Sequence, residues 1–284
     1  MKSEIRDSTI RSLSERVRKR NYTKYLTGMR LVKLRGFTDV EVRFDFPVTA
    51  LIGPNGAGKT TMLGAIMGLL PRSQGGIRFD GSNLDDLEVE EVVGLGMNLV
   101  PESRALFGEL SVEDNLLLGA FARHRSGHRD HDQTMAQVYE IFPRLRERRG
   151  QHAGTLSGGE RQRARLAQLA TQNPAILLCD EPLNHLDLRH QVATMQFLAS
   201  AATNGKVVVA SLHDPRWAQA CCDHAILMYH FAHIDQGLTA EVITHNALLS
   251  LYGAAVAAHP LVAAGPWRPA ESNPTRGASR PTPR

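Results

Sequence analysis

The residues best suited to chemistry form a glycine-rich run from Gly53 to Thr61. An apolar stretch, Val48–Ile52, precedes this run and a helical pattern over Met62–Leu70 follows it. The spacing G-x-x-x-x-G-K-T between a strand and a helix is that of a phosphate-binding loop. Glycines let backbone N–H groups and the helix N-terminus approach phosphate oxygens closely. We therefore predict that a nucleoside triphosphate binds to Gly53, Pro54, Asn55, Gly56, Ala57, Gly58, Lys59, Thr60 and Thr61.

Five polar side chains fit the chemistry of phosphoryl transfer at this loop. Lys59 supplies a point charge for the phosphates, and the Thr60 hydroxyl can ligate Mg²⁺. Asp180 follows a buried-type apolar strand, so its carboxylate can join the same Mg²⁺ shell. Glu181 comes next and is placed to polarise a water molecule against the γ-phosphate. His213 ends the following apolar strand, and ligands bind at this carboxyl edge of open parallel sheets.

The elements around these residues indicate an α/β fold. Strict alternation of apolar and polar residues over Val40–Asp45 predicts a half-buried strand, and Met29–Leu34 predicts another before it. Further on, strands alternate with helical patterns, which is typical of a largely parallel sheet with helices on both faces. These later strands are predicted at 97–100, 175–179, 206–211 and 225–229.

Composition excludes several classes of protein. No apolar run approaches the roughly 20 residues that cross a bilayer, and Met1–Lys24 lacks the apolar centre of a secretory signal. The 3 cysteines have no metal-type spacing and are expected to be reduced thiols in a cytosolic protein. The first 35 residues carry 11 Lys and Arg against 3 Asp and Glu. Such a basic end could contact anionic lipid or nucleic acid, although we favour a solvated, partly disordered end.

Four further stretches resemble one known family, the ABC ATPases. Leu156–Arg163 resembles the family's signature sequence, and Ile176–Pro182 resembles its Walker B strand with the catalytic glutamate. Asn184–Asp187 resembles the D-loop, and Ser211–Asp214 resembles the switch-histidine loop. The resemblance implies a P-loop NTPase with a RecA-like core, N-terminal antiparallel strands and a helical signature subdomain. We expect a basic leader at 1–28, the ATPase domain at 29–253 with its helical subdomain at about 103–170, and a disordered tail at 254–284.

The same resemblance implies a composite nucleotide site. ABC ATPases work as head-to-tail dimers with two ATP molecules in the interface, and one motif set in this chain implies a homodimer. Each ATP would contact the phosphate loop of one subunit and Ser157, Gly158, Gly159 and Asp187 of the other. That arrangement is physically reasonable, because the N–H groups at a helix N-terminus and of the glycines can bind the negatively charged γ-phosphate.

Different parts of the chain resemble different branches of the family. Residues 29–62 look like the SMC- and RecF-like DNA-maintenance ATPases. Residues 75–160 look like the ATPase of branched-chain amino acid importers, a branch with glutamate at the Q-loop position, where this chain has Glu102. Glu102 could order a metal-bound water and sense the γ-phosphate. Residues 161–253 look like the ATPases of cobalamin, haem and iron-siderophore importers. Candidates for stacking on adenine are Phe37, Tyr22 and Tyr25.

The resemblance as a whole implies the ATP-hydrolysing subunit of an importer. It would act on a separate transmembrane permease through Glu102 and residues 103–150, and indirectly on a solute-binding protein. Such a subunit is cytoplasmic and peripheral on the inner face of the cell membrane. Cargo would be cobalamin, haem or an iron siderophore, or branched-chain amino acids.

Two alternatives remain. The first is a DNA-maintenance ATPase. The segment from Lys59 to Ser157 disfavours this alternative, because it is short and has no sustained heptads of a coiled coil. A nucleic-acid partner is therefore not expected. The second is a mosaic of branches that binds ATP without coupling to transport.

Overall fold

A six-stranded sheet organises the part of the chain that the computed structural model describes. That part comprises residues 26–34, 37–44, 46–70, 75–79, 82–102, 106–125, 127, 131–229 and 233–253. Most of the expected leader, the whole expected tail, Tyr22, Tyr25 and the side chain of Phe37 lie outside the described residues. The strand order in this sheet is β10-β9-β3-β8-β7-β6. The strands are β3 (Val48–Ile52), β6 (Met97–Val100), β7 (Ile176–Cys179), β8 (Val207–Leu212), β9 (His224–Met228) and β10 (Ile234–Leu238).

All neighbouring strands of this sheet are parallel except β10, which pairs antiparallel with β9 at one edge. Strands β3 and β8 are buried along their whole length, as expected for strands of a parallel sheet with helices on both faces. Ile52 pairs with Leu212, and Cys179 pairs with Ala210. This register brings the segments that follow β3, β7 and β8 to the same edge of the sheet.

A second, antiparallel sheet covers one side of the first. Its order is β2-β1-β4-β5, with β1 (Leu26–Leu34), β2 (Phe37–Arg43), β4 (Gly75–Phe79) and β5 (Ser82–Asn83). The Gln236 amide joins the two sheets, since it donates to Glu41 O at 2.9 Å and accepts from Arg43 N at 2.8 Å. The N-terminal antiparallel strands predicted from the sequence are therefore present.

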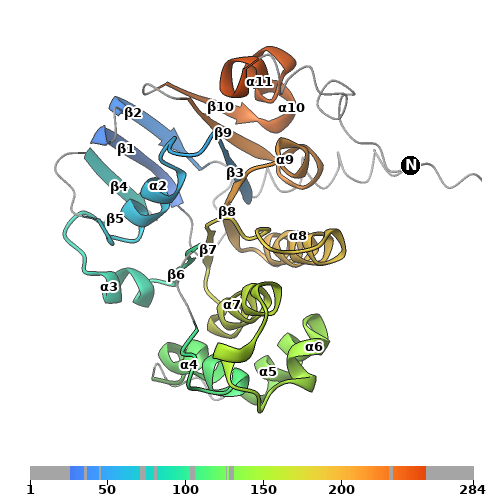
Figure 1. Cartoon of the computed structure of the whole chain (residues 1–284). Coiled ribbons are helices and arrows are strands. Elements are labelled where there is room, and N and C mark those ends of the chain that lie inside the picture. Colours follow the sequence, from blue (N-terminus) through green and yellow to red (C-terminus); the bar gives the residue numbers. More distant parts are fainter. Residues whose placement is uncertain are drawn as a thin grey trace, which may run out of the picture.

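Helices cover both faces of the parallel sheet (Figure 1). Helix α2 (Lys59–Ile66) packs into a core that both sheets share, and α3 (Val89–Gly94) lies at the edge of that core. Helices α8 (Leu188–Thr203), α9 (Pro215–Cys221), α10 (Thr239–Val242) and α11 (His245–Tyr252) contribute to the core on the opposite face. The predicted α/β class, with a parallel sheet and flanking helices, is confirmed.

A helical group of α4 (Val112–Arg125), α5 (His131–Ile141), α6 (Pro143–Glu147) and α7 (Gly158–Gln172) has its own core and occupies the lower part of Figure 1. Helices α4 and α7 approach closely because α4 has a glycine at the contact. A Cβ on Gly119 would lie 2.3 Å from the Thr171 Oγ1, and that hydroxyl donates to Leu116 O at 2.9 Å. No helix in the described part of the chain is long and apolar enough to span a membrane.

Candidate active site

The glycine-rich loop begins where β3 ends and runs directly into α2. A Cβ on Gly53 would lie 2.4 Å from Met228 O, so only glycine lets the chain pass the end of β9. Gly56 and Gly58 have φ angles of 83° and 101°, in the left-handed region that glycine adopts without a steric penalty. The loop conformation therefore depends on the glycines that the motif supplies.

The Lys59 ammonium group lies inside this loop. Its Nζ donates to Gly53 O, and to Pro54 O at 3.3 Å. Burial lowers the pKa of Lys59, while the negative charges of Glu181, Asp180 and Glu102 act in the opposite direction. The structure thus gathers three predicted carboxylates around the predicted phosphate-binding lysine. Thr60 is exposed in the first turn of α2.

Asp180 fits a role as a cation ligand. The residue is 1% exposed, and its Oδ1 accepts from Ser211 Oγ at 2.7 Å. Its Oδ2 is buried and has no hydrogen-bond partner, which is costly for a carboxylate unless a ligand completes it. The described residues contain no group of three or more His, Cys, Asp and Glu side chains that could hold a metal unaided. A Mg²⁺ ion here would therefore combine Asp180 and Thr60 with nucleotide oxygens.

Glu181 is held by three neighbouring side chains. Its backbone N–H donates to Ser211 Oγ at 2.8 Å, and its φ of 50° turns the chain sharply after β7. His213 Nε2 lies 2.6 Å from Glu181 Oε1, while Asn184 Nδ2 donates to Glu181 Oε2. The side chain of Glu181 is 9% exposed, and contacts on both carboxylate oxygens fix its orientation.

Glu102 lies beside Glu181. Burial, followed by the charge of Glu181 and a hydrogen bond with it, raises the pKa of Glu102. Asn184 Nδ2 is 3.5 Å from Glu102 Oε1. The Glu102 carbonyl accepts from Arg165 Nη1 of α7 at 2.8 Å, which ties the segment after β6 to the helical group.

The remaining predicted residues form a second group, at the starts of α7 and α8. Ser157 caps α7: its Oγ accepts from Glu160 N at 3.3 Å, and Glu160 Oε2 accepts from Ser157 N at 3.0 Å. Ser157 and Gly158 are exposed and Gly159 is half-buried. A Cβ on Gly159 would lie 3.1 Å from His185 O. Asp187 caps α8 by accepting from His190 N at 3.0 Å, and this bond lowers the pKa of Asp187.

Three residues of this region make contacts that were not predicted from the sequence. Ser211 bridges Asp180 and Glu181, Asn184 contacts two glutamates, and Arg165 holds Glu102. A polar residue at the end of the apolar run Val207–Leu212 was a usable signal for Ser211. The other two contacts depend on how loops fold back, and spacing does not reveal them.

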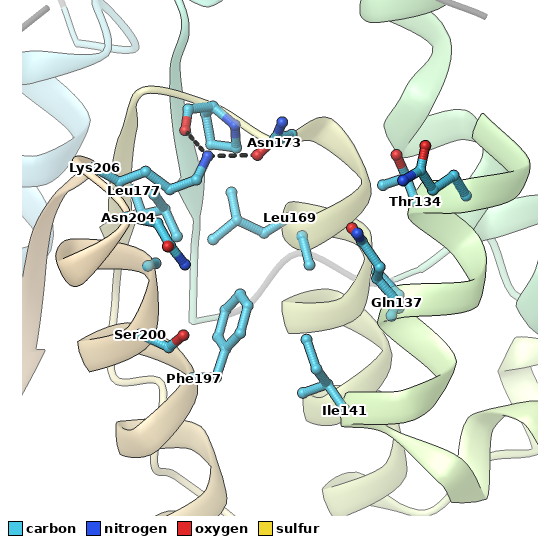
Figure 2. Close-up of a pocket in the computed structure, with 15 residues that line it drawn as sticks. Thr134, Gln137, Ile141, Leu169, Asn173, Leu177, Phe197, Ser200, Asn204 and Lys206 are labelled. Atoms are coloured by element: carbon cyan, nitrogen blue, oxygen red, sulfur yellow. Dashed lines mark hydrogen bonds between the residues drawn. The ribbon is translucent and has the colours of Figure 1, made fainter. Parts of the chain in front are cut away.

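A pocket of about 290 Å³ lies elsewhere, between α5, the end of α7 and α8. Figure 2 shows Lys206 reaching Asn173 beside the apolar side chains of Leu169, Leu177 and Phe197. Lys206 Nζ donates to Asn173 Oδ1 and to Pro174 O, both at 2.6 Å. None of the predicted site residues lines this pocket, and Lys206 there binds the side chain of Asn173, the residue that follows the C-terminal end of α7.

Comparison with known proteins places these features in one family. The model of the ABC transporter family matches residues 44–184. The hemin import ATP-binding protein HmuV of Streptomyces coelicolor is 35% identical over 224 residues, covering 78% of this chain and 79% of that protein. The branched-chain amino acid transport ATP-binding protein BraG of Pseudomonas aeruginosa is 38% identical over 151 residues, covering 53% and 64%. The lipopolysaccharide export ATP-binding protein LptB of Escherichia coli is 28% identical over 236 residues, covering 82% and 95%.

Solved structures show the same fold. An ATP-binding subunit of an ABC transporter matches with a TM-score of 0.67 and 24% identity, covering 81% of this chain and 95% of the other. A dimeric ATP-binding cassette bound to ADP and phosphate matches with a TM-score of 0.65 and 21% identity, covering 76% and 99%. From the phosphate loop, the carboxylates gathered around Lys59 and these relatives together, we conclude that the chain belongs to the ABC transporter ATP-binding family and is an ATPase.

Proposed function

We propose that this ATPase drives an importer by acting on a separate membrane permease. The observation that carries the proposal is the assembly of Lys59, Asp180, Glu181 and His213 at one sheet edge, in a chain with import ATPases among its relatives. LptB, which serves export, is also a relative but at a lower identity of 28%. Between the two import classes we favour haem or iron-siderophore cargo, because the HmuV match spans far more of this chain than the BraG match.

In the proposed reaction, the loop amides and Lys59 bind the β- and γ-phosphates. Glu181 accepts a proton from a water molecule whose oxygen attacks the γ-phosphorus, and the bond to the β–γ bridging oxygen breaks. His213 holds the Glu181 carboxylate in orientation. Thr60 and Asp180 would hold the Mg²⁺ that binds with ATP, and Glu102 would order one of its water ligands. The ion would supply positive charge to neutralise the charge that develops on the phosphate oxygens.

A head-to-tail homodimer would complete each nucleotide site. Ser157 and Gly158 are exposed at the N-terminus of α7, a 15-residue helix whose first N–H groups suit an anion. Gly159 and Asp187 lie in the same group. The exposure of Ser157, Gly158 and Asp187 supports a role for this group in binding the ATP that the partner subunit holds in its phosphate loop.

An apolar surface on the helical group supports docking of the permease. Phe107 is 64% exposed and Phe121 is 60% exposed, with Leu110, Leu117 and Leu118 also exposed beside or on α4. Exposed large apolar side chains gathered on one element are typical of interaction sites. The Glu102 carbonyl accepts from Arg165 of α7, which packs against α4 in the same helical group, so these contacts offer a route from a permease bound at α4 to the candidate site. In this proposal the working protein lies on the inner face of the membrane, attached through its partner.

The decisive experiment uses Glu181→Gln, which removes the proposed base. Purified protein should be monomeric by light scattering and should become dimeric with Mg-ATP, because bound ATP is no longer consumed. Adding Ser157→Arg to the same chain should abolish the dimer while leaving ATP binding intact.

Folded Glu181→Gln protein that binds ATP but stays monomeric at every concentration tested would argue against an autonomous ATP-sandwich dimer. It would favour the uncoupled mosaic. Wild-type protein without any Mg-dependent ATP hydrolysis would contradict the roles given to Asp180 and Glu181.

A further inference from the structure

We propose that Asn184 is a positioning residue for ATP hydrolysis. Its side-chain amide holds the Glu181 carboxylate and joins it to Glu102. This inference rests on the proposed role of Glu181 as the base. It goes beyond that role because it identifies a residue that orients the Glu181 carboxylate.

The loop geometry fixes where the Asn184 side chain lies. Glu181 is anchored at its N–H by Ser211 Oγ, and Asn184 N donates to Glu181 O at 3.1 Å, which closes a turn. His185 continues in the left-handed region with a φ of 60°. Asp187 then caps α8. The turn is held at its start by Ser211 of β8 and runs at its end into α8. The amide of Asn184 is thereby brought back to the carboxylate of Glu181, the first residue of the turn.

The amide and His213 divide the two oxygens of Glu181 between them. His213 contacts Oε1 at 2.6 Å and Asn184 donates to Oε2. Donated hydrogen bonds stabilise an anionic carboxylate. An amide has no group that could take up the proton from water, so Asn184 orients the base without competing with it. With only one of the two contacts, the carboxyl group could rotate about its last bond.

The same nitrogen also faces a second carboxylate. An amide nitrogen carries two N–H groups, and Asn184 Nδ2 lies 3.5 Å from Glu102 Oε1. The Glu102 carboxylate therefore faces the same amide nitrogen that donates to Glu181 Oε2. Two neighbouring carboxylates repel each other, and a hydrogen-bond donor shared between them offsets part of that repulsion. Asn184 therefore keeps Glu181 from being turned away by Glu102, whose carbonyl Arg165 holds in place.

The test compares three full-length variants by steady-state ATPase assay and by binding of a fluorescent ATP analogue. Asn184→Ala should lower kcat by about 10- to 100-fold, as expected for a misplaced catalytic group, with unchanged nucleotide affinity. Asn184→Asp has the same shape but adds a third negative charge, so its loss should be at least as large. Asn204→Ala makes the same change at an exposed residue after the other end of α8 and should leave kcat unchanged.

A double-mutant cycle separates positioning from simple loss of structure. If Asn184 acts through Glu181, then adding Asn184→Ala to Glu181→Gln should not lower the residual turnover further. Active wild-type protein, inactive Glu181→Gln and a fully active Asn184→Ala would overturn this inference and leave the proposed function standing. Parallel loss of ATP affinity and melting temperature in Asn184→Ala would also overturn it. Full activity of Glu181→Gln would instead contradict the proposed function itself.

Discussion

His213 Nε2 lies 2.6 Å from Glu181 Oε1, and the two side chains differ greatly in exposure: 42% for the imidazole and 9% for the carboxylate. The histidine follows β8 and the glutamate follows β7, which are neighbouring parallel strands. The contact is therefore a consequence of sheet register, and it holds a buried carboxylate from the solvent side.

We predict that His213→Ala lowers kcat for ATP hydrolysis by about 100-fold, within the range attributed to positioned acid–base groups. Nucleotide affinity should change little, because the loop and Lys59 remain. Single-turnover hydrolysis of radiolabelled ATP, with binding measured separately, distinguishes a slower chemical step from weaker nucleotide binding. A variant with normal turnover would show that the Glu181 contact has no part in the chemical step.

The cap of α7 gives a prediction about stability. Ser157→Ala removes the hydroxyl that accepts from Glu160 N, and loss of a cap costs about 1 kcal/mol. We expect the free energy of unfolding in urea, without nucleotide, to fall by about that amount. Ser200→Ala, an exposed serine within α8, is the matched control. Equal stabilities of the two variants would contradict the capping role.

Most strands of the parallel sheet, and the edge where the candidate site residues lie, could be predicted because local signals specify them. Strand β3 and the loop after it, or β7 with Asp180, combine an apolar run with a motif at its end. The antiparallel edge strand β10 was not predicted, since Ile234–Leu238 is only partly buried and lacks a clear alternation. The bridging role of Ser211 and the double contact of Asn184 depend on which strands are neighbours and how one turn folds back.

The apolar surface of α4 gives a prediction about coupling. Phe121→Glu places a charge at a side chain that is 60% exposed, so it should be tolerated by the fold and by ATP hydrolysis in the isolated subunit. Reconstituted with its permease in proteoliposomes, the variant should lose most ATP-driven uptake, because burying an unpaired charge in an interface is unfavourable. Arg189→Ala, an exposed change on α8, serves as the control. Normal uptake by Phe121→Glu would exclude this surface as the docking site.

Lys206 gives a prediction about pH. Burial lowers the pKa of Lys206 from its ordinary 10.5 to about 8. Below pH 8 the amine is charged in both the folded and unfolded chain, so the full cost of burying the charge is present. Between about pH 8 and 10.5 the unfolded chain binds more protons than the folded one. Stability from this group therefore rises with pH across that interval.

We accordingly expect wild-type protein to gain stability relative to Lys206→Met as pH increases from 7 to 10, measured by urea unfolding at each pH. The variant leaves the acceptors Asn173 Oδ1 and Pro174 O without their lysine donor, which lowers its stability by an amount that does not depend on pH. Other titrating groups are common to both proteins and cancel in the difference. Parallel stability curves over this range would mean that the folded protein does not shift the pKa of Lys206.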